Sequence, residues 1–256
     1  MNLAEVTVVI LTRNEEPNIQ RCLDSVSWAA HVVIVDSEST DQTGPICQKS
    51  ANTRVAFRQF DNHTDQWNFG LEQVTTAWVL CLDADYVCPL SLPQEIASLS
   101  GDVDGYHARF RYLINGKPLR GTLYPPRVCL FCKAKLRYVA DGHTQLLDVR
   151  DAKLSTLASV IDHDDRKPLS RWLASQSKYA VLEADKLLST DKTQLGWKDR
   201  LRLKIVLAPL LTIGYCLFWK RLILDGRPGI FYTMQRTYAE LLLSLELLDR
   251  KLRKSE

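Results

Sequence analysis

Short apolar runs alternate with polar, helix-like segments over residues 1–90 of the chain. Four of these runs predict strands at 6–11, 31–35, 54–57 and 77–82, and the first of them is rich in β-branched side chains. The segments between them predict helices at 17–27, 42–49 and 65–74, the first of which begins with a proline suited to a helix N-terminus. Continuous apolar strands joined by helical crossovers indicate an α/β fold with a mainly parallel sheet and helices on both faces.

The pattern changes twice in the rest of the chain. Between residues 105 and 161, short mixed strands with turn signals at Asn115-Gly116 and Pro125-Pro126 predict an antiparallel addition to the sheet edge. After Pro168 the pattern predicts helices at 169–188, 195–224 and 229–252. We therefore expect two domains, an α/β domain over residues 1–167 and a helical extension over residues 168–256.

Polar side chains follow three of the expected strands at their carboxyl ends: Arg13-Asn14, Asp36, and Asp83-Ala84-Asp85. Ligands of parallel sheets bind at this edge, so the three clusters are expected to converge on one site. Alternation along an extended chain would place Asp83 and Asp85 on one side. Carboxylate oxygens suit Mg²⁺ or Mn²⁺, which usually complete their coordination with substrate phosphates. Taken alone, the acidic triplet is equally well explained as a polar strand end.

Composition narrows the class of protein. The net charge of +3 is too small to predict a nucleic-acid partner. Seven cysteines, an odd number scattered through apolar stretches, indicate reduced thiols, and the lone pair Cys129 and Cys132 does not predict zinc. The N-terminus lacks signal-peptide features, and no run reaches the about 18 apolar residues of a spanning helix. We expect the chain on the cytoplasmic side.

Four stretches carry a resemblance, and they stand in order within residues 1–165: VTVVILTRNEEPNIQRCLDSV, VVIVDSESTDQT, QWNFGLEQVTTAWVLCLDADY and YPPRVCLF. Together they resemble glycosyltransferase family 2, the inverting enzymes that use nucleotide-diphosphate sugars. The resemblance implies a GT-A catalytic domain, the nucleotide-diphospho-sugar transferase-like fold, over residues 1–167. With the tail LAPLLTIGYCLFWKRLILDGRPGIFYTMQR, the chain looks most similar to bacterial enzymes that extend lipopolysaccharide or other lipid-linked glycans.

The resemblance also assigns roles to individual residues. It implies a nucleotide-sugar site at Thr12, Asn14, Glu15, Asp36, Asn68, Asp83 and Arg127. In that site Asp36 would hydrogen-bond the base, and Asp83 would face the ribose and the sugar. Asp85 would bind Mg²⁺ or Mn²⁺ that bridges the diphosphate and neutralises its developing charge. Trp67 stands where the family usually has a basic residue, and Tyr86 stands where it often has Glu.

An inverting transfer needs one general base to deprotonate the acceptor hydroxyl. Family members usually supply a carboxylate after a glycine-containing loop, which corresponds here to the stretch 139–145. Gln145 occupies the position where Glu would be expected, so Asp141 is the first candidate for the base and His143 the second. The other interpretation, that Asp141 is only a turn residue before Gly142, stays open.

The stretch 161–168 is the other dense polar cluster. By the same resemblance, His163 would supply a further metal ligand, because GT-A enzymes often use a histidine after the last core strand. The alternative is a solvated linker with a helix cap. Arg127 and Arg166 are candidates for clamping the diphosphate, since a guanidinium fork suits phosphate, or are ordinary surface arginines.

The segment Ile205–Trp219 contains no charged residue and is interrupted by Pro209 and Gly214. It is too short and too broken to span a membrane, but it suits a segment lying in the membrane interface. Basic residues at 198, 200, 202 and 204 would each contribute up to about 1 kcal/mol near anionic lipid. We expect an anionic membrane surface to meet residues 198–221. The alternative is a helix that packs on the catalytic domain or forms a homodimer.

These observations favour a metal-dependent, inverting glycosyltransferase on the inner face of the cytoplasmic membrane. Its partners would be a nucleotide-diphosphate sugar donor and a lipid-linked or lipopolysaccharide-core saccharide acceptor. A non-catalytic sugar-nucleotide or glycan-binding module is the alternative, because the loop at 139–145 lacks the expected Glu. A nucleotidyltransferase would need an early glycine-rich phosphate loop, and TRNEEPN contains no glycine.

Overall fold

The computed structural model of the chain describes residues 1–141, 144–191 and 193–253. These residues form two compact units. Unit 1 comprises Met1–Gly116 and Leu123–Arg166, and unit 2 comprises Lys117–Thr122 and Lys167–Glu256.

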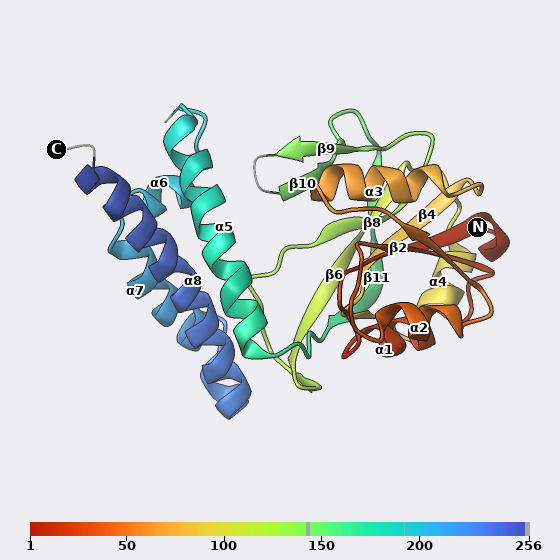
Figure 1. The fold of residues 1–256 in the computed structure, drawn as a ribbon, viewed down its shortest axis with the longest axis horizontal. Helices are drawn as coiled ribbons and strands as arrows, with labels where there is room; N and C mark the ends of the chain where they lie inside the picture. The colour runs from red at the N-terminus through yellow and green to blue at the C-terminus, as the bar shows by residue number, and fades with distance from the viewer. Residues whose placement is uncertain (142–143, 192, 254–256) are drawn as a thin grey trace. The chain divides into compact units, whose positions relative to one another are not determined.

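Unit 1 is built on a mixed sheet (Figure 1). Its strands are β1 (Val6–Thr12), β2 (His31–Asp36), β3 (Thr53–Phe57), β4 (Trp78–Asp83), β5 (Tyr86–Val87), β6 (Gly105–Ile114), β8 (Arg127–Cys132) and β11 (Leu154–His163). They lie in the order β3-β2-β1-β4-β8-β6-β11-β5. Strands β3, β2, β1 and β4 are parallel, which confirms the predicted parallel core of the sheet.

The added strands differ from the sequence-based expectation. Strand β8 runs antiparallel to both β4 and β6, and it lies inside the sheet rather than at its edge. Strands β6 and β11 pair in parallel, and only the short β5 adds an antiparallel edge to β11. Turn signals locate strand ends, but they do not reveal which strands pair.

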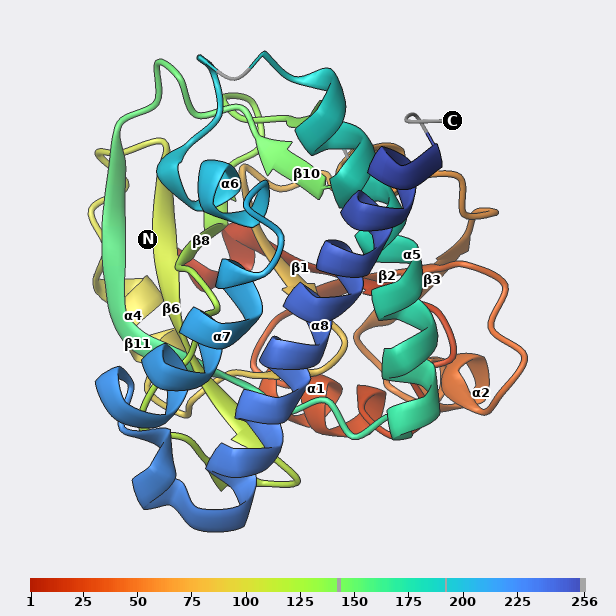
Figure 2. The same cartoon turned by 90° about the vertical axis from the view of Figure 1, so that its left-hand side faces the viewer.

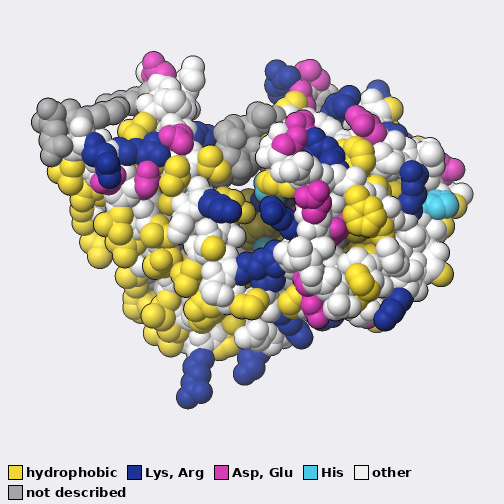
Figure 3. Space-filling model, viewed as in Figure 1, with side chains coloured by type: hydrophobic (Ala, Val, Ile, Leu, Met, Phe, Trp, Pro, Cys, Tyr) yellow, Lys and Arg dark blue, Asp and Glu magenta, His cyan; other side chains and the backbone are white. Residues whose placement is uncertain are grey.

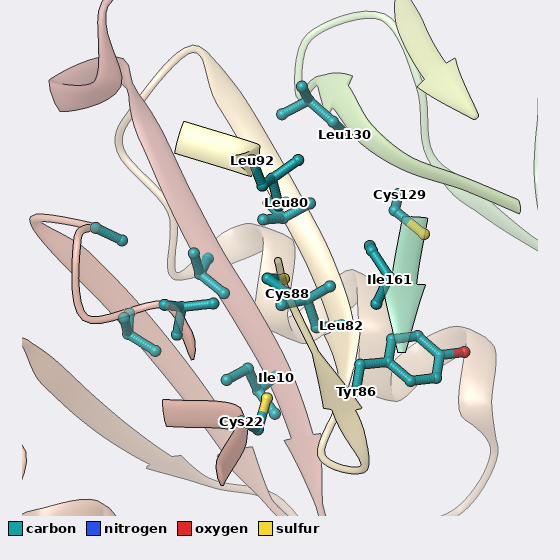
Figure 4. Packing of buried hydrophobic residues seen from close by; sticks show 14 of the residues in the cluster. Ile10, Cys22, Leu80, Leu82, Tyr86, Cys88, Leu92, Cys129, Leu130 and Ile161 are labelled. Carbon is teal, nitrogen blue, oxygen red and sulfur yellow. The ribbon is translucent and has the colours of Figure 1, made fainter. Parts of the chain in front are cut away.

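Helices cover both faces of the sheet in Figure 1. They are α1 (Ile19–Ser25), α2 (Thr43–Gln48), α3 (His63–Glu72) and α4 (Leu92–Ser98). Alternation along β1 sends Val8 and Ile10 into one core with α1 and α4, and it sends Val9 into the other core with α3. Figure 4 shows the first of these cores, where Ile10 and Cys22 pack beside the side chains of β4.

Helix α3 lies close against the sheet because it carries Gly70 at the point of contact. A Cβ at this position would lie 2.8 Å from Cγ1 of Val9 and 3.1 Å from Cγ2 of Val35. The close approach fixes α3 over β1 and β2, and it also brings α3 against a hairpin of β9 (Tyr138–Asp141) and β10 (Thr144–Leu147).

Unit 2 is helical, apart from the two-residue strand β7 (Lys117–Pro118). Its helices are α5 (Leu169–Ser189), α6 (Trp197–Arg202), α7 (Leu207–Gly214) and α8 (Gly226–Arg253), with a π-helical turn at Tyr215–Trp219 and a 3₁₀ turn at Leu222–Asp225. Figures 1 and 2 show α5 and α7 beside α8, against which both pack.

The predictions of helices at 169–188 and 229–252 are confirmed, whereas a continuous helix over 195–224 is wrong. Ile205 and Arg221 adopt left-handed backbone conformations, with φ of 61° and 57°, and these interrupt the helix. Within the described residues, no single helix is long and apolar enough to cross a membrane. By length and composition, only the bent pair Leu207–Trp219 and Leu222–Arg253, kinked by 68°, meets that requirement.

Candidate functional site

Asp36 organises the loop that follows β2. Its carboxylate accepts hydrogen bonds from Oγ1 of Thr12 at 2.8 Å and from the backbone N and Oγ of Ser39 at 2.9 and 2.6 Å. The side chain is buried, and the residue is only 2% exposed. To bind a nucleotide base, Asp36 would use carboxylate lone pairs that are not engaged in these three hydrogen bonds.

The loop after β1 is tied to the loop after β2. Asn14 adopts a left-handed conformation with φ of 55°, which asparagine tolerates better than most residues. Its backbone N donates to Oγ of Ser39 at 2.7 Å, and its Oδ1 accepts from the backbone N of Thr40 at 2.6 Å. The backbone N of Glu15 donates to Oγ1 of Thr43 at 2.6 Å. The structure thus brings together Thr12, Asn14, Glu15 and Asp36, as the sequence predicted.

Asp83 ends β4, and its nearest basic partner is Arg127 at the start of β8. Nη1 of Arg127 lies 4.0 Å from Oδ2 of Asp83, and both side chains are partly exposed. The Arg127 guanidinium also stacks over the ring of Tyr124, 4.7 Å from its centroid. The Tyr124 hydroxyl is hydrogen-bonded to that of Tyr86, and burial raises the pKa of both phenols, so both stay protonated. Arg127 therefore has a fixed stem and an accessible guanidinium.

Strand β4 ends at Asp83, so Asp85 lies in the turn that follows the strand. The alternation argument for a shared side is therefore wrong, and the two carboxylates have different partners. Oδ2 of Asp85 lies 3.3 Å from Nε2 of His163, which ends β11, and each of these side chains is only 12% exposed. The two residues predicted as metal ligands are thus neighbours in space, although they lie far apart in sequence.

Three tyrosine rings enclose His163. Its ring centroid lies 4.5 Å from that of Tyr112, 4.9 Å from that of Tyr124 and 5.2 Å from that of Tyr86. Burial alone would lower the pKa of His163, but the adjacent Asp85 carboxylate more than offsets this effect, so the pKa is raised. Nδ1 of His163 is buried without a hydrogen-bond acceptor among the described residues.

The pair of Asp85 and His163 fits a divalent cation in its donor chemistry, since one oxygen and one imidazole nitrogen face each other at 3.3 Å. Over the described part of the chain, no group of three or more His, Cys, Asp or Glu side chains is arranged to hold a metal ion. A cation here would take its remaining ligands from substrate oxygens and water, as Mg²⁺ and Mn²⁺ commonly do.

Asp164 anchors the end of β11 next to this pair. Its backbone N donates to the carbonyl oxygen of Asp85 at 3.0 Å. Its carboxylate, nearly fully buried, accepts from Nη1 of Arg21 at 2.8 Å, from Nε of Arg166 at 2.9 Å and from the backbone N of Gly116 at 3.0 Å. Arg166, considered above as a diphosphate clamp, is thus engaged in an ion pair that holds this corner together.

Asn18 connects the same corner to the loop after β1. Its Nδ2 donates to Oε2 of Glu15 and to Oδ1 of Asp165, both at 2.9 Å. Its Oδ1 accepts from Nη2 of Arg21 and from the backbone N of Arg166, also at 2.9 Å. The carboxylate of Glu15 is therefore oriented by a network that reaches the end of β11.

Asn68 lies on α3, and its side chain pairs with the backbone of β9. Its Nδ2 donates to the carbonyl oxygen of Tyr138 at 3.0 Å, and its Oδ1 accepts from the backbone N of Tyr138 at 3.2 Å. The ring of Trp67 stacks on that of Tyr138 with centroids 5.4 Å apart. These contacts hold the strand that ends at Asp141. The side chain of Asp141 and the whole of His143, the two predicted bases, lie outside the described residues.

The sequence analysis missed His63, the first residue of α3. Its ring packs edge-on against Phe60 with centroids 4.9 Å apart, and the side chain is half-buried. Burial lowers the pKa of His63. The nearby charge of Asp83 opposes this shift of the pKa, and the charge of Arg127 adds to it. His63 also lies one helical turn before Trp67, the position at which a basic residue was expected. That spacing is the signal that would have identified it.

The three tyrosines around His163 were missed as well. Tyr86 directly follows the acidic triplet, and Tyr124 lies three residues before Arg127. Their spacing in the sequence does not show that they meet. Tyr86 and Tyr112 meet at His163 because β5, β6 and β11 are neighbours in the sheet, and Tyr124 joins them from the segment before β8.

Comparisons with known proteins agree with this architecture. The model of the family described as Glycosyl transferase family 2 matches residues 7–123. The lipopolysaccharide core biosynthesis glycosyltransferase LpsC of Rhizobium meliloti (strain 1021) is 26% identical over 207 residues, which are 75% of each chain. An uncharacterised glycosyltransferase of Rickettsia typhi (strain ATCC VR-144 / Wilmington) is 31% identical over 112 residues, 43% of this chain and 37% of that one.

Two solved structures share the fold. The mannosyltransferase PcManGT from Pyrobaculum calidifontis, in complex with GDP-Man and Mn²⁺, superposes with a TM-score of 0.57 at 16% identity, covering 95% of this chain and 87% of that one. S. aureus TarS 1-349 in complex with UDP-GlcNAc superposes with a TM-score of 0.51 at 16% identity, covering 98% and 92%. Both likenesses support the predicted GT-A fold.

The parallel strands β3, β2, β1 and β4, with polar loops gathered at their carboxyl ends, have the arrangement of a GT-A sheet. The family model matches the part of the chain that contains β1 to β4. Over residues 7–123 the chain therefore belongs to glycosyltransferase family 2, and it has a GT-A fold.

Proposed function

We propose that this enzyme transfers a sugar, with inversion, from a nucleotide-diphosphate donor to a lipid-linked or lipopolysaccharide-core saccharide. The observation that carries the proposal is the convergence of three strand-end loops with the pair Asp85–His163 on one edge of the sheet. The similarity to LpsC supports the choice of acceptor. The donors named for PcManGT and TarS support a nucleotide-diphosphate sugar as the donor class.

The donor would lie along this edge. The linked loops after β1 and β2 would frame the base and ribose, with Asn14, Glu15 and Asp36 as their polar groups. Asp83 would face the ribose and sugar hydroxyls, where a carboxylate accepts hydrogen bonds from them. Arg127, held by its stacking on Tyr124, would donate to the diphosphate in the manner that suits a guanidinium.

Asp85 and His163 would hold Mg²⁺ or Mn²⁺. When bound, the cation would neutralise charge on the departing diphosphate. The chain's own contribution is to fix the two ligands: Asp164 holds the backbone of Asp85, and the tyrosines limit movement of the His163 ring. Without that support, a site built on two protein ligands would lose its geometry.

We propose Asp141 as the general base, with His143 as the alternative. The base takes the proton of the acceptor hydroxyl as that oxygen attacks the anomeric carbon. The bond from this carbon to the diphosphate oxygen breaks on the opposite side, and the diphosphate leaves with the electron pair. Asp141→Asn should lower turnover by about 100-fold or more while donor binding persists. If His143→Gln alone has that effect, the assignment moves to His143.

We also propose that residues 1–167 form the catalytic domain and that residues 168–256 form an extension associated with the inner face of the cytoplasmic membrane. A lipid-linked acceptor supports this location, because its glycan is presented at a membrane surface.

A donor screen tests the proposed function. Purified enzyme is incubated with nucleotide-diphosphate sugars, with and without Mn²⁺, and both thermal stabilisation and nucleoside diphosphate release are measured. We expect one donor class to stabilise the protein and to be turned over only with the cation, giving a product of inverted anomeric configuration by NMR. Lipopolysaccharide-core acceptors are then added to the same mixtures. If the protein is thermally stabilised but no donor is turned over, the result would instead support a glycan-binding module.

A further inference from the structure

Unit 2 exposes an unusually large set of apolar side chains. Over α7 and the π-helical turn that follows it, Leu210 is 61% exposed, Phe218 67% and Trp219 77%. Figure 3 shows hydrophobic side chains gathered over the region of α7 and α8 on the face in view. Apolar area of this extent on a protein surface marks an interaction site for a protein or a membrane.

Helix α8 continues the same surface. Its exposed apolar residues recur at alternating spacings of three and four along one face: Phe231, Met234, Tyr238, Leu241, Leu245, Leu248 and Leu252. The opposite face is buried through Tyr232, Leu243 and Leu247. Both faces of α8 are thus apolar, but only one of them packs against unit 2.

The unpaired charge around α7 and the turns that follow it is positive. From Leu203 to Leu224 the sequence contains no acidic residue, and its charged residues are Lys204, Lys220 and Arg221. Arg227 follows at the start of α8, and the one acidic residue between, Asp225, is ion-paired with Arg120 at 3.0 Å. Cations that border an apolar, aromatic-rich surface complement a bilayer with anionic headgroups.

Within the basic segment 198–204, Arg202 makes contacts inside unit 2. Arg202 is ion-paired with Glu240 at 2.7 Å and with Glu183 at 3.0 Å, and these contacts join α6 to α8 and α5. Its charge is therefore committed within unit 2. Val206 and the exposed apolar side chains of α7 follow directly after this segment.

We propose that α7, the turns through Asp225 and the exposed face of α8 form a surface that inserts in the plane of an anionic bilayer. Phe218 and Trp219 form its apolar corner, and Lys220, Arg221 and Arg227 contact the headgroups. This inference rests on the proposed lipid-linked acceptor, and it names the lipid surface that brings the enzyme to it. A second copy of the chain is the competing occupant. Lipid is favoured over a second copy because most positions that flank the exposed apolar row of α8, such as Gln235, Thr237 and Leu242, are uncharged. Uncharged side chains at these positions cannot form the charge pairs that specify coiled coils.

The test is flotation of the full-length protein with vesicles of phosphatidylcholine, with and without one third phosphatidylglycerol. The double variant Phe218→Glu/Trp219→Glu should bind anionic vesicles about tenfold or more weakly than wild type, since two large apolar side chains no longer enter the bilayer. The matched control is Leu90→Glu, which changes a side chain 92% exposed on unit 1 and should bind as wild type does. Circular dichroism confirms that all three proteins are folded.

Two results would overturn the proposal: equal vesicle binding by wild type and the double variant, or no binding by wild type. If light scattering then shows a wild-type dimer that the double variant dissociates, the surface is a contact between copies. Donor hydrolysis is measured in parallel, because none of these substitutions lies at the sheet edge that binds donor. Loss of hydrolysis with intact vesicle binding would contradict the proposed function and leave this inference standing.

Discussion

At the scale of single residues, the acidic triplet divides into two carboxylates with different surroundings. Asp83 faces Arg127 and is partly open to solvent, whereas Asp85 is buried against His163. An open carboxylate beside a guanidinium suits hydrogen bonds with sugar hydroxyls. A buried carboxylate beside an imidazole suits a cation, because the two supply oxygen and nitrogen ligands together.

Metal binding should depend on pH through His163. Its pKa is raised above the ordinary value, so a proton competes with the cation for Nε2. In metal-free protein, the charged pair with Asp85 stabilises the fold at low pH, and this contribution is lost as pH rises through the raised pKa. Calorimetric Mn²⁺ titrations should therefore show affinity falling about tenfold per pH unit below that pKa. Affinity independent of pH would show that His163 is not a ligand.

His63 should contribute to donor binding. It is half-buried beside Phe60, and its lowered pKa keeps the ring neutral near neutral pH, so one ring nitrogen can donate and the other accept. We expect His63→Ala to raise the KM for donor by about tenfold, which corresponds to the loss of one hydrogen bond. His31→Ala, at the exposed amino end of β2, is the control. Identical kinetics for both variants would remove His63 from the site.

At the scale of elements, the contact between α3 and β9 determines where the proposed base is held. Gly70 lets α3 approach the sheet closely, and Trp67 and Asn68 then fix Tyr138 on the neighbouring strand. The asparagine side chain acts here as a short strand partner that satisfies both backbone groups of Tyr138. Strand β9 is therefore held against α3 at Tyr138.

Asn68→Ala should destabilise the protein by about 1–3 kcal/mol, because it leaves the N–H and C=O of Tyr138 without their partner. Turnover should fall as well, since the strand that ends at Asp141 loses its support. Urea denaturation measures the first effect and steady-state kinetics the second. The control is Glu72→Ala, on the same helix as Asn68, which removes an exposed ion pair between Glu72 and Arg137. This variant should change the free energy of unfolding by less than about 1 kcal/mol. Equal losses in both variants would contradict the role given to Asn68.

The order and type of elements in the first part of the chain could be predicted because local pattern and burial agree there. In β1, successive residues face different cores, and the unbroken apolar run reports burial on both faces. The breaks at Ile205 and Arg221 could not be predicted, since neither residue type favours a left-handed conformation. The enclosure of His163 depends on strand pairing, which the spacing of tyrosines in sequence does not encode.

At the scale of the whole molecule, the chain combines a sheet edge of polar loops with a helical unit that exposes many apolar side chains. The first would bind a charged, water-soluble donor, and the second would bind the surface on which the acceptor is displayed. This division fits an enzyme whose two substrates come from different phases. The proposed transfer would then take place next to the headgroups.

Binding to anionic vesicles should weaken with salt without being abolished. The cations at Lys220, Arg221 and Arg227 contribute a screened attraction, which falls as the Debye length shrinks to about 3 Å at 1 M salt. The apolar contribution persists under these conditions. Flotation across a salt series should therefore show a partial decrease to a plateau. Complete release at high salt would indicate a purely electrostatic contact and contradict insertion.

The most direct test of the account is the metal dependence of sugar transfer in Asp85→Asn. Nucleoside diphosphate release is measured against Mn²⁺ concentration for wild type, for this variant and for Asp162→Asn. Asp162 precedes His163 and pairs on the surface with Arg111, so its substitution controls for local damage. We predict that Asp85→Asn loses about 100-fold or more in kcat/KM and that Asp162→Asn stays near wild type. Full turnover by Asp85→Asn at saturating Mn²⁺ would contradict the proposed site.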